Sequence, residues 1–146
     1  MRQRDYILRM IEQFAEALAR IAGLKRAGKL DEAELLVRQT ADSIFGPLRG
    51  MIEKVDAASA ALLLEGHDKI GVYASLCAEQ AEIWESRGED ARARAEYRRA
   101  LELHLEAARR APDGAASQIE AIRALRAKVD EARLAPPYRA MLDGLA

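Results

Sequence analysis

The stretch Ala74–Leu103, ASLCAEQAEIWESRGEDARARAEYRRALEL, predicts two amphipathic helices joined by a tight turn at Gly88. In its second half, small or apolar residues recur on one helical face, and they are Ala93, Tyr97, Ala100, Leu101 and Leu103. In its first half, Cys77, Ala81 and Trp84 repeat in the same way. Glycine favours the left-handed backbone that often ends a helix, and Asp90 is a candidate cap for the next helix. The stretch is therefore expected to form a helical hairpin whose helices touch through alanines.

The same residues resemble a tetratricopeptide repeat, whose pattern begins W-x2-L-G-x2-Y and continues A-x3-F. The matching positions are Cys77, Gln80, Ala81 and Trp84, followed by Ala93, Tyr97 and Ala100, whereas Leu105 stands at the expected proline. A weaker second copy surrounds Gly28, with Ala33, Val37 and Thr40 at the same offsets and Leu24 in place of Trp84. The two glycines stand 60 residues apart, whereas tandem copies recur every ~34 residues. The resemblance therefore implies two repeat-like hairpins separated by an inserted helical segment.

These patterns predict a single all-α domain over residues 1–146, built from antiparallel helical hairpins. Any hairpin with alanine contacts would share the spacing, so a bundle stays open beside a short solenoid of about six to seven helices. The expected parts are a first hairpin (3–45), an inserted segment (47–66), the central hairpin (68–111) and C-terminal capping helices (115–146). Helix caps are expected at Asp68 and at the pair Asp31 and Glu34, and helix breaks at Gly46-Pro47, near Asp56 and at Pro112-Asp113-Gly114.

The first expected helix, from about Gln3 to Arg26, carries a continuous apolar stripe beside a polar face of mixed charge. Packing within the domain, a partner helix and a membrane surface are all compatible with such a stripe, although membrane-surface helices favour lysine and arginine on the polar face. We expect its first half to form a homodimer face, with residues Ile7, Met10, Ile11 and Phe14. The opening RDYILRMI also resembles the start of an uncharacterised bacterial family of small helical proteins.

Composition and motifs argue against several classes of function. A formal net charge of −1 gives no electrostatic case for nucleic-acid binding, and the N-terminus has no apolar run long enough for a signal peptide or a membrane span. A single cysteine fits a reducing, cytoplasmic location. We expect no metal, cofactor or catalytic residue, since His67 and His104 lack ligand spacing and are predicted to be surface or capping residues. Along the arginine-rich strip from Arg87 to Arg110, ion pairs are expected for Asp90–Arg94, Arg98–Glu102 and Glu106–Arg110.

The remaining hypothesis is a non-catalytic scaffold or protein-binding module that self-associates. In the repeat family the first helix of each hairpin lines a concave groove, so the resemblance places a partner groove at Leu18, Ala22, Lys25, Ser75, Ala78, Glu82 and Glu85. Because Glu82 and Glu85 would repel a carboxylate, we expect a basic or apolar partner. The alternative is a small-molecule sensor or enzyme with an inter-helix pocket lined by Tyr73, Cys77, Trp84 and Tyr97.

Overall fold

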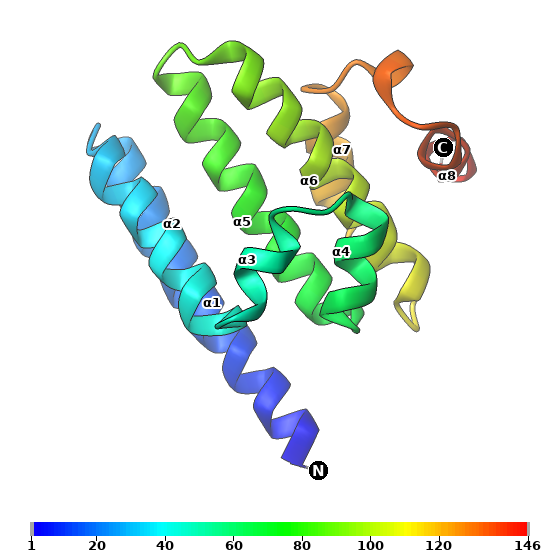
Figure 1. The fold of residues 1–146 in the computed structure, drawn as a ribbon, viewed down its shortest axis with the longest axis horizontal. Coiled ribbons are helices and arrows are strands. Elements are labelled where there is room, and N and C mark those ends of the chain that lie inside the picture. Colours follow the sequence, from blue (N-terminus) through cyan, green and yellow to red (C-terminus); the bar gives the residue numbers. More distant parts are fainter. Residues whose placement is uncertain (1, 146) are drawn as a thin grey trace.

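The computed structural model describes residues 2–145, which form helices and turns with no strand among them. Two helical hairpins lie side by side (Figure 1), and they are α1 (Arg2–Arg26) with α2 (Leu30–Phe45) and α5 (His67–Ser86) with α6 (Asp90–Arg110). The inserted segment contains α3 (Leu48–Ile52) and α4 (Ala57–Leu64). After α6 follow α7 (Ile119–Arg126), a short 3-10 turn (Glu131–Arg133) and α8 (Pro136–Gly144). The all-helical prediction is confirmed.

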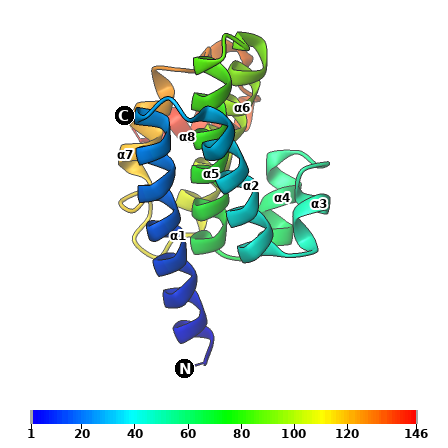
Figure 2. The ribbon, with the colours of Figure 1, turned by 90° about the vertical axis from the view of Figure 1, so that its left-hand side faces the viewer.

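The second view separates the inserted helices from the C-terminal ones (Figure 2). Helices α3 and α4 lie on one side of the central hairpin, whereas α1 and α7 lie on the other side. Helix α4 packs mainly on α6, and both α7 and α8 also pack on α6. The central hairpin therefore separates two faces of the protein, and α6 contacts helices on both of them.

Both hairpin turns have the same backbone structure. Gly28 and Gly88 have φ values of 75° and 80°, in the left-handed region that side chains rarely adopt. The amide of the residue after each glycine donates across the turn, Lys29 to the Leu24 carbonyl and Glu89 to the Trp84 carbonyl, both at 2.9 Å. This bond spans six residues. Together with a second bond, in which each glycine amide donates to the carbonyl three residues before it, it forms the Schellman motif. Leu24 and Trp84 are therefore equivalent positions, since the carbonyl of each accepts the same hydrogen bond of its turn.

Alanines and large aliphatic residues together make the core. Ala33 and Ala41 of α2, Ala74 and Ala81 of α5, and Ala93 and Ala100 of α6 are all at most 5% exposed. Small side chains bring helix axes close together, and the space beyond each seam is filled by Ile70, Ile83, Leu101 and Leu103. The edge of one ring packs against the face of the other where Phe45 meets Tyr73, at 5.5 Å between centroids. This packing gives the side-by-side hairpins one continuous core.

Three predicted helix caps are wrong. Helices α2 and α6 begin directly after their turns, with Lys29 and Glu89 at the cap positions, and α5 begins after Gly66. Asp31, Asp68 and Asp90 therefore lie inside the first helical turn, where a carboxylate still interacts favourably with the helix dipole. The expected break near Asp56 is confirmed, since its carboxylate accepts from the Ser59 amide at 2.8 Å and caps α4.

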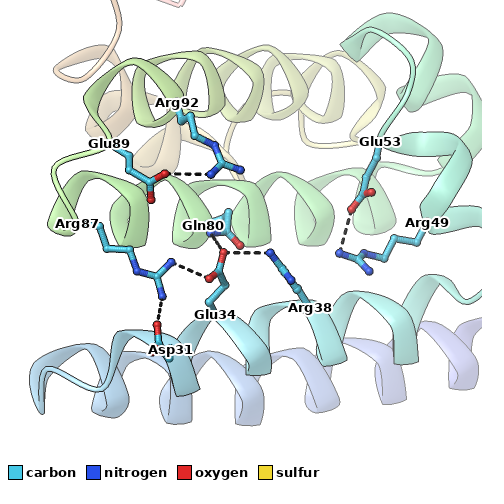
Figure 3. Close-up of polar contacts among 9 residues, drawn as sticks. All are labelled: Asp31, Glu34, Arg38, Arg49, Glu53, Gln80, Arg87, Glu89 and Arg92. Atoms are coloured by element: carbon cyan, nitrogen blue, oxygen red, sulfur yellow. Dashed lines mark hydrogen bonds and ion pairs between the residues drawn. The ribbon is translucent and has the colours of Figure 1, made fainter.

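The pair predicted to cap α2 instead connects the two hairpins (Figure 3). Arg87, at the turn of the central hairpin, donates to Asp31 at 2.5 Å and to Glu34 at 2.7 Å. Gln80 donates to the second oxygen of Glu34 at 3.0 Å. Burial raises the pKa of Glu34, but the hydrogen bond and charge of Arg87 outweigh this effect and lower it overall. The side chains thus tie α2 to α5 near the two glycine turns.

Only one of the three predicted ion pairs within α6 is present. Glu106 pairs with Arg110 at 2.6 Å, whereas among residues 2–145 no ion pair joins Asp90 to Arg94 or Arg98 to Glu102. An exposed pair gains only a few tenths of a kcal/mol, about 0.3–0.5 for this spacing, so water competes with it effectively.

Candidate functional site

Three helices, α1, α5 and α7, run in the same direction and form the walls and floor of a groove. At one end the Tyr6 ring lies 5.5 Å from Lys69 Nζ, and at the other Lys25 Nζ lies 3.0 Å from Glu82 Oε2, so α1 is parallel to α5. Gln118, just before α7, lies against Gly71, and Lys128, just after α7, pairs with Glu85 at 3.1 Å. Helix α7 is therefore parallel to α5 as well, and it lies to the right of α5 in Figure 1, whereas α1 lies to the left.

Two adjoining cavities follow α5 between these walls. The first has a volume of about 270 Å³ and is lined mainly by Leu18 of α1, Ser75 and Ala78 of α5, and Ala121 and Leu125 of α7. The second, of about 620 Å³, lies nearer the start of α5 and is lined by Ile11, Phe14, Gly71, Ser75 and Ser117 among others. Ser75 lines both cavities, so they form one groove along α5.

The groove residues predicted from the sequence have different positions in the structure. Leu18, Ser75, Ala78 and Glu82 all line the first cavity. Lys25 and Glu85 lie at its end in ion pairs, and half-buried Ala22 is not among the lining residues. The structure thus brings four of the seven residues together in one cavity. The wall contributed by α7 was absent from the prediction, since Ala121, Ala124, Leu125 and Lys128 belong to no recognised hairpin.

Charged groups at the end of the groove are paired. Lys25 Nζ lies 2.5 Å from Glu79 Oε1 and 3.0 Å from Glu82 Oε2. Burial lowers the pKa of Lys25, but its hydrogen bonds to the two glutamates outweigh this and raise it. Hydrogen bonds from Lys128 and Tyr97 lower the pKa of Glu85. Glu82 and Glu85 are therefore not free anions, although carboxylates still outnumber lysines in the groove.

A buried polar pair joins the two cavities. His104 is 3% exposed, and its Nδ1 lies 2.7 Å from Gln118 Oε1. The prediction of a surface or capping position for His104 is therefore wrong. Burial lowers the pKa of His104 and the bond to Gln118 opposes that shift, so the buried ring favours its neutral form. The sequence signal for burial of His104 was its helical spacing, because it lies on the same face of α6 as Tyr97 and Leu101.

The absence of a side chain at Gly71 allows Gln118 to pack directly against α5. A Cβ at residue 71 would lie 3.1 Å from the Gln118 Nε2 and 3.2 Å from its Oε1, closer than ordinary contacts. The missing side chain thus lets the Gln118 amide approach α5 while its oxygen faces His104.

The four residues of the predicted small-molecule pocket do not line a common cavity. Tyr97 faces the groove, whereas Tyr73 and Trp84 line a different cavity between α2, α3, α5 and α6. Cys77 is buried beside Tyr73, and burial raises its pKa well above the ordinary value. The hairpin places Tyr97 on one face of α6 and the other three side chains toward the opposite side of the protein.

The residues of the predicted dimer face are divided between core and surface. Met10 is only 4% exposed within the single chain, and Ile7 and Phe14 are half-buried. Ile11 is exposed at the mouth of the second cavity, which Phe14 also lines. Further exposed apolar side chains near the start of α1 are Tyr6 and Leu8.

No protein-family model, curated protein or solved structure matches this chain. Among residues 2–145, no helix combines the length and the hydropathy that a membrane crossing requires. The same residues contain no group of three or more histidine, cysteine, aspartate or glutamate side chains placed to hold a metal ion.

Proposed function

We propose that this protein is a non-catalytic binding module of tetratricopeptide-like type, which holds a segment of a partner protein in the groove between α1 and α7. The observation that carries the proposal is the pair of adjoining cavities along α5, bounded by parallel helices on both sides. The two identical glycine turns add support, since repeats of this type place the first helix of each hairpin along a groove.

The lining of the groove favours an amphipathic partner segment with basic ends. Its middle is small and apolar, with Leu18, Ala78 and Leu125. Four carboxylates, Asp68, Glu79, Glu82 and Asp113, line the two cavities against one lysine of the lining, Lys128, although Lys25 pairs with Glu79 and Glu82 from the end of the groove. An apolar middle contributes affinity through buried area, while complementary charges at the ends contribute orientation and association rate.

Filling the groove tests this function. We expect Ala78→Trp, which places an indole on the groove floor, to abolish capture of the partner. Ala58→Trp is the matched control, because Ala58 is exposed on α4 on the opposite side of the central hairpin. Affinity purification with wild type and both variants, followed by mass spectrometry, identifies proteins that only Ala78→Trp fails to capture. The purified partner is then titrated by calorimetry against all three proteins.

A photo-reactive residue placed at Ala124 should crosslink to that partner, whereas the same residue at Ala58 should not, since Ala124 is exposed and lines the groove. Partner binding that Ala78→Trp leaves unchanged, or crosslinks that form from position 58 and not from 124, would contradict the proposed groove.

We also propose self-association through the start of α1, where Tyr6, Leu8 and Ile11 are 46%, 49% and 37% exposed. Light scattering is expected to give a dimer mass at micromolar concentration for wild type and a monomer mass for a Leu8→Glu and Ile11→Glu double variant. Leu35→Glu, which places one such charge at an exposed apolar position of α2, is expected to remain dimeric. A monomeric wild type would remove self-association from the proposal without affecting the groove.

A further inference from the structure

An arginine-rich cavity of about 500 Å³ lies between α2, α3, α5 and α6, away from the groove. Four arginines line it, Arg38, Arg49, Arg92 and Arg99, together with two glutamates, Glu53 and Glu96. The excess of positive charge contrasts with the net charge of −1 of the whole chain. Like charges gathered in one cavity repel one another, so such a cluster gains stability from an anion between them.

Three of the arginines come from different helices and point into a shared space (Figure 3). Arg38 of α2 is held by Glu34 at 3.3 Å, and Arg92 of α6 by Glu89 at 3.0 Å. Neither of these glutamates lines the cavity, so each holds its arginine from the rim. Arg49 of α3 bonds Asp42 at 2.9 Å and Glu53 at 3.0 Å. Because a guanidinium carries five N–H donors, these contacts orient the arginines and leave further donors for a ligand.

Arg99 supplies the innermost positive charge. Its guanidinium donates to the carbonyls of Ile52 and Val55, both at 2.7 Å. These acceptors are neutral, and among residues 2–145 no carboxylate forms an ion pair with Arg99. Glu96, which lines the cavity as well, has its pKa raised by burial. Among the four arginines that line the cavity, Arg99 is thus the one that forms no ion pair within residues 2–145.

We propose that this cavity binds a small phosphate-bearing anion, of the size of a diphosphate or a mononucleotide. Guanidinium groups match the geometry of phosphate oxygens and form paired, charge-assisted hydrogen bonds with them. The volume suits such a ligand. The convergence of arginines from three helices also fits a ligand contacted from several sides, whereas arginines that only pair along their own helices would need no shared cavity.

Trp84 makes the proposal directly measurable. It is the only tryptophan of the chain, it lines the cavity, and its ring lies 4.1 Å from the Arg92 guanidinium carbon. Titration with inorganic phosphate, pyrophosphate or ATP at constant ionic strength is expected to change tryptophan fluorescence in a saturable way for pyrophosphate, ATP or both. Calorimetry provides the second measurement, independent of the fluorophore. A response to pyrophosphate alone would assign a diphosphate-sized ligand, and a tighter response to ATP would assign a nucleotide.

Variants of the cavity arginines identify the site. Arg38→Gln and Arg92→Gln are each expected to weaken binding about tenfold or more, because each removes a charge-assisted contact. Arg94→Gln is the matched control on α6, since Arg94 is exposed and does not line the cavity. More than half of each of the Arg38 and Arg92 side chains is exposed, so both proteins should fold, and circular dichroism checks this. Arg92→Lys keeps the positive charge but loses the planar pair of donors of the guanidinium, so it should weaken anion binding less than Arg92→Gln does.

Absence of saturable binding for all three probes at millimolar concentration would overturn the proposal. The same follows if potassium chloride at equal ionic strength reproduces the fluorescence change, because the response would then be charge screening alone. Binding that Arg38→Gln and Arg92→Gln leave unaltered would place the anion elsewhere and would equally overturn this assignment.

Discussion

Leu101→Ala is expected to lower the free energy of unfolding by about 2–5 kcal/mol, the range for removing a large buried aliphatic side chain. Leu101 is 0% exposed and lies on α6, which packs against α4, α5, α7 and α8. The alanine loses the transfer free energy of the deleted carbons and leaves a cavity that helices held on several sides cannot close. A domain of this size is stable by only about 5–15 kcal/mol, so the loss is a large fraction of the total.

Urea unfolding followed by far-UV circular dichroism measures this change. Leu62→Ala is the matched control, because Leu62 is 71% exposed on α4 and its truncation should alter stability by no more than about 0.5 kcal/mol. Equal effects of the two substitutions would mean that α6 is not at the centre of the core.

The hairpins could be predicted because their signals are local. Gly28 and Gly88 each need a left-handed backbone, and alanines at fixed offsets mark the seam of each hairpin. The predictions of helix caps at Asp31 and Asp90 were wrong for a related reason. A Schellman turn leaves so few residues between helices that the next helix begins before Asp31 or Asp90 can cap it. Boundaries of this kind depend on the bonding of the turn and less on residue type.

The groove could be predicted only in part, because helical periodicity identifies a face but not what lies opposite it. Leu18 and Ser75 come from equivalent helices, so the offset between the two copies sufficed to relate them. Helix α7 follows an irregular stretch after Pro112, and no sequence pattern relates Leu125 or Lys128 to α5.

The arginine-rich cavity illustrates the same limit. Arg92 and Arg99 belong to the arginine-rich strip from Arg87 to Arg110, for which the sequence predicted only ion pairs along one helix, whereas Arg38 and Arg49 come from two other helices. Their convergence depends on how α2 and α3 pack against the central hairpin, and spacing along one helix carries no information about that packing.

Glu106→Leu is expected to cost about 2–4 kcal/mol of stability, because it removes the acceptor at the centre of a buried polar cluster. Glu106 is 2% exposed, accepts from Tyr138 at 2.7 Å, and pairs with Arg110 at 2.6 Å and Arg109 at 2.8 Å. The substitution leaves the buried Tyr138 hydroxyl without this partner and releases the link between α6 and α8. Hydrogen exchange should therefore accelerate in residues 136–144.

A double-mutant cycle with Tyr138→Phe isolates the link. Tyr138→Phe alone should cost about 1–2 kcal/mol, and the double variant should cost less than the sum of the two single changes by about 1 kcal/mol. Glu120→Leu on α7 is the control, because Glu120 is exposed and should change stability by no more than about 0.5 kcal/mol. Strict additivity of Glu106→Leu and Tyr138→Phe would show that the hydroxyl and the carboxylate contribute independently.

The pH dependence of the free energy of unfolding tests the same cluster, because a lowered and a raised pKa of Glu106 change that free energy in opposite directions. Burial raises the pKa of Glu106, but the hydrogen bonds from Arg110 and Tyr138 outweigh it and lower the pKa below the ordinary value of 4.5. The unfolded chain therefore takes up its proton first on acidification. The stability contributed by Glu106 is complete above pH 4.5 and decreases as the pH falls through the lowered pKa of the folded state.

The measured difference between wild type and Glu106→Leu should consequently be largest above pH 4.5 and should narrow below it. Burial also raises the pKa values of Glu79 and Glu96, so these two carboxyls stabilise the folded protein further on acidification. Glu106 does not influence either pKa and both proteins contain the two residues, so their contributions cancel in the difference. Unfolding curves collected for both proteins over a series of pH values provide the comparison. A difference that widens on acidification would mean that the effect of burial dominates and that Glu106 is held as a neutral acid.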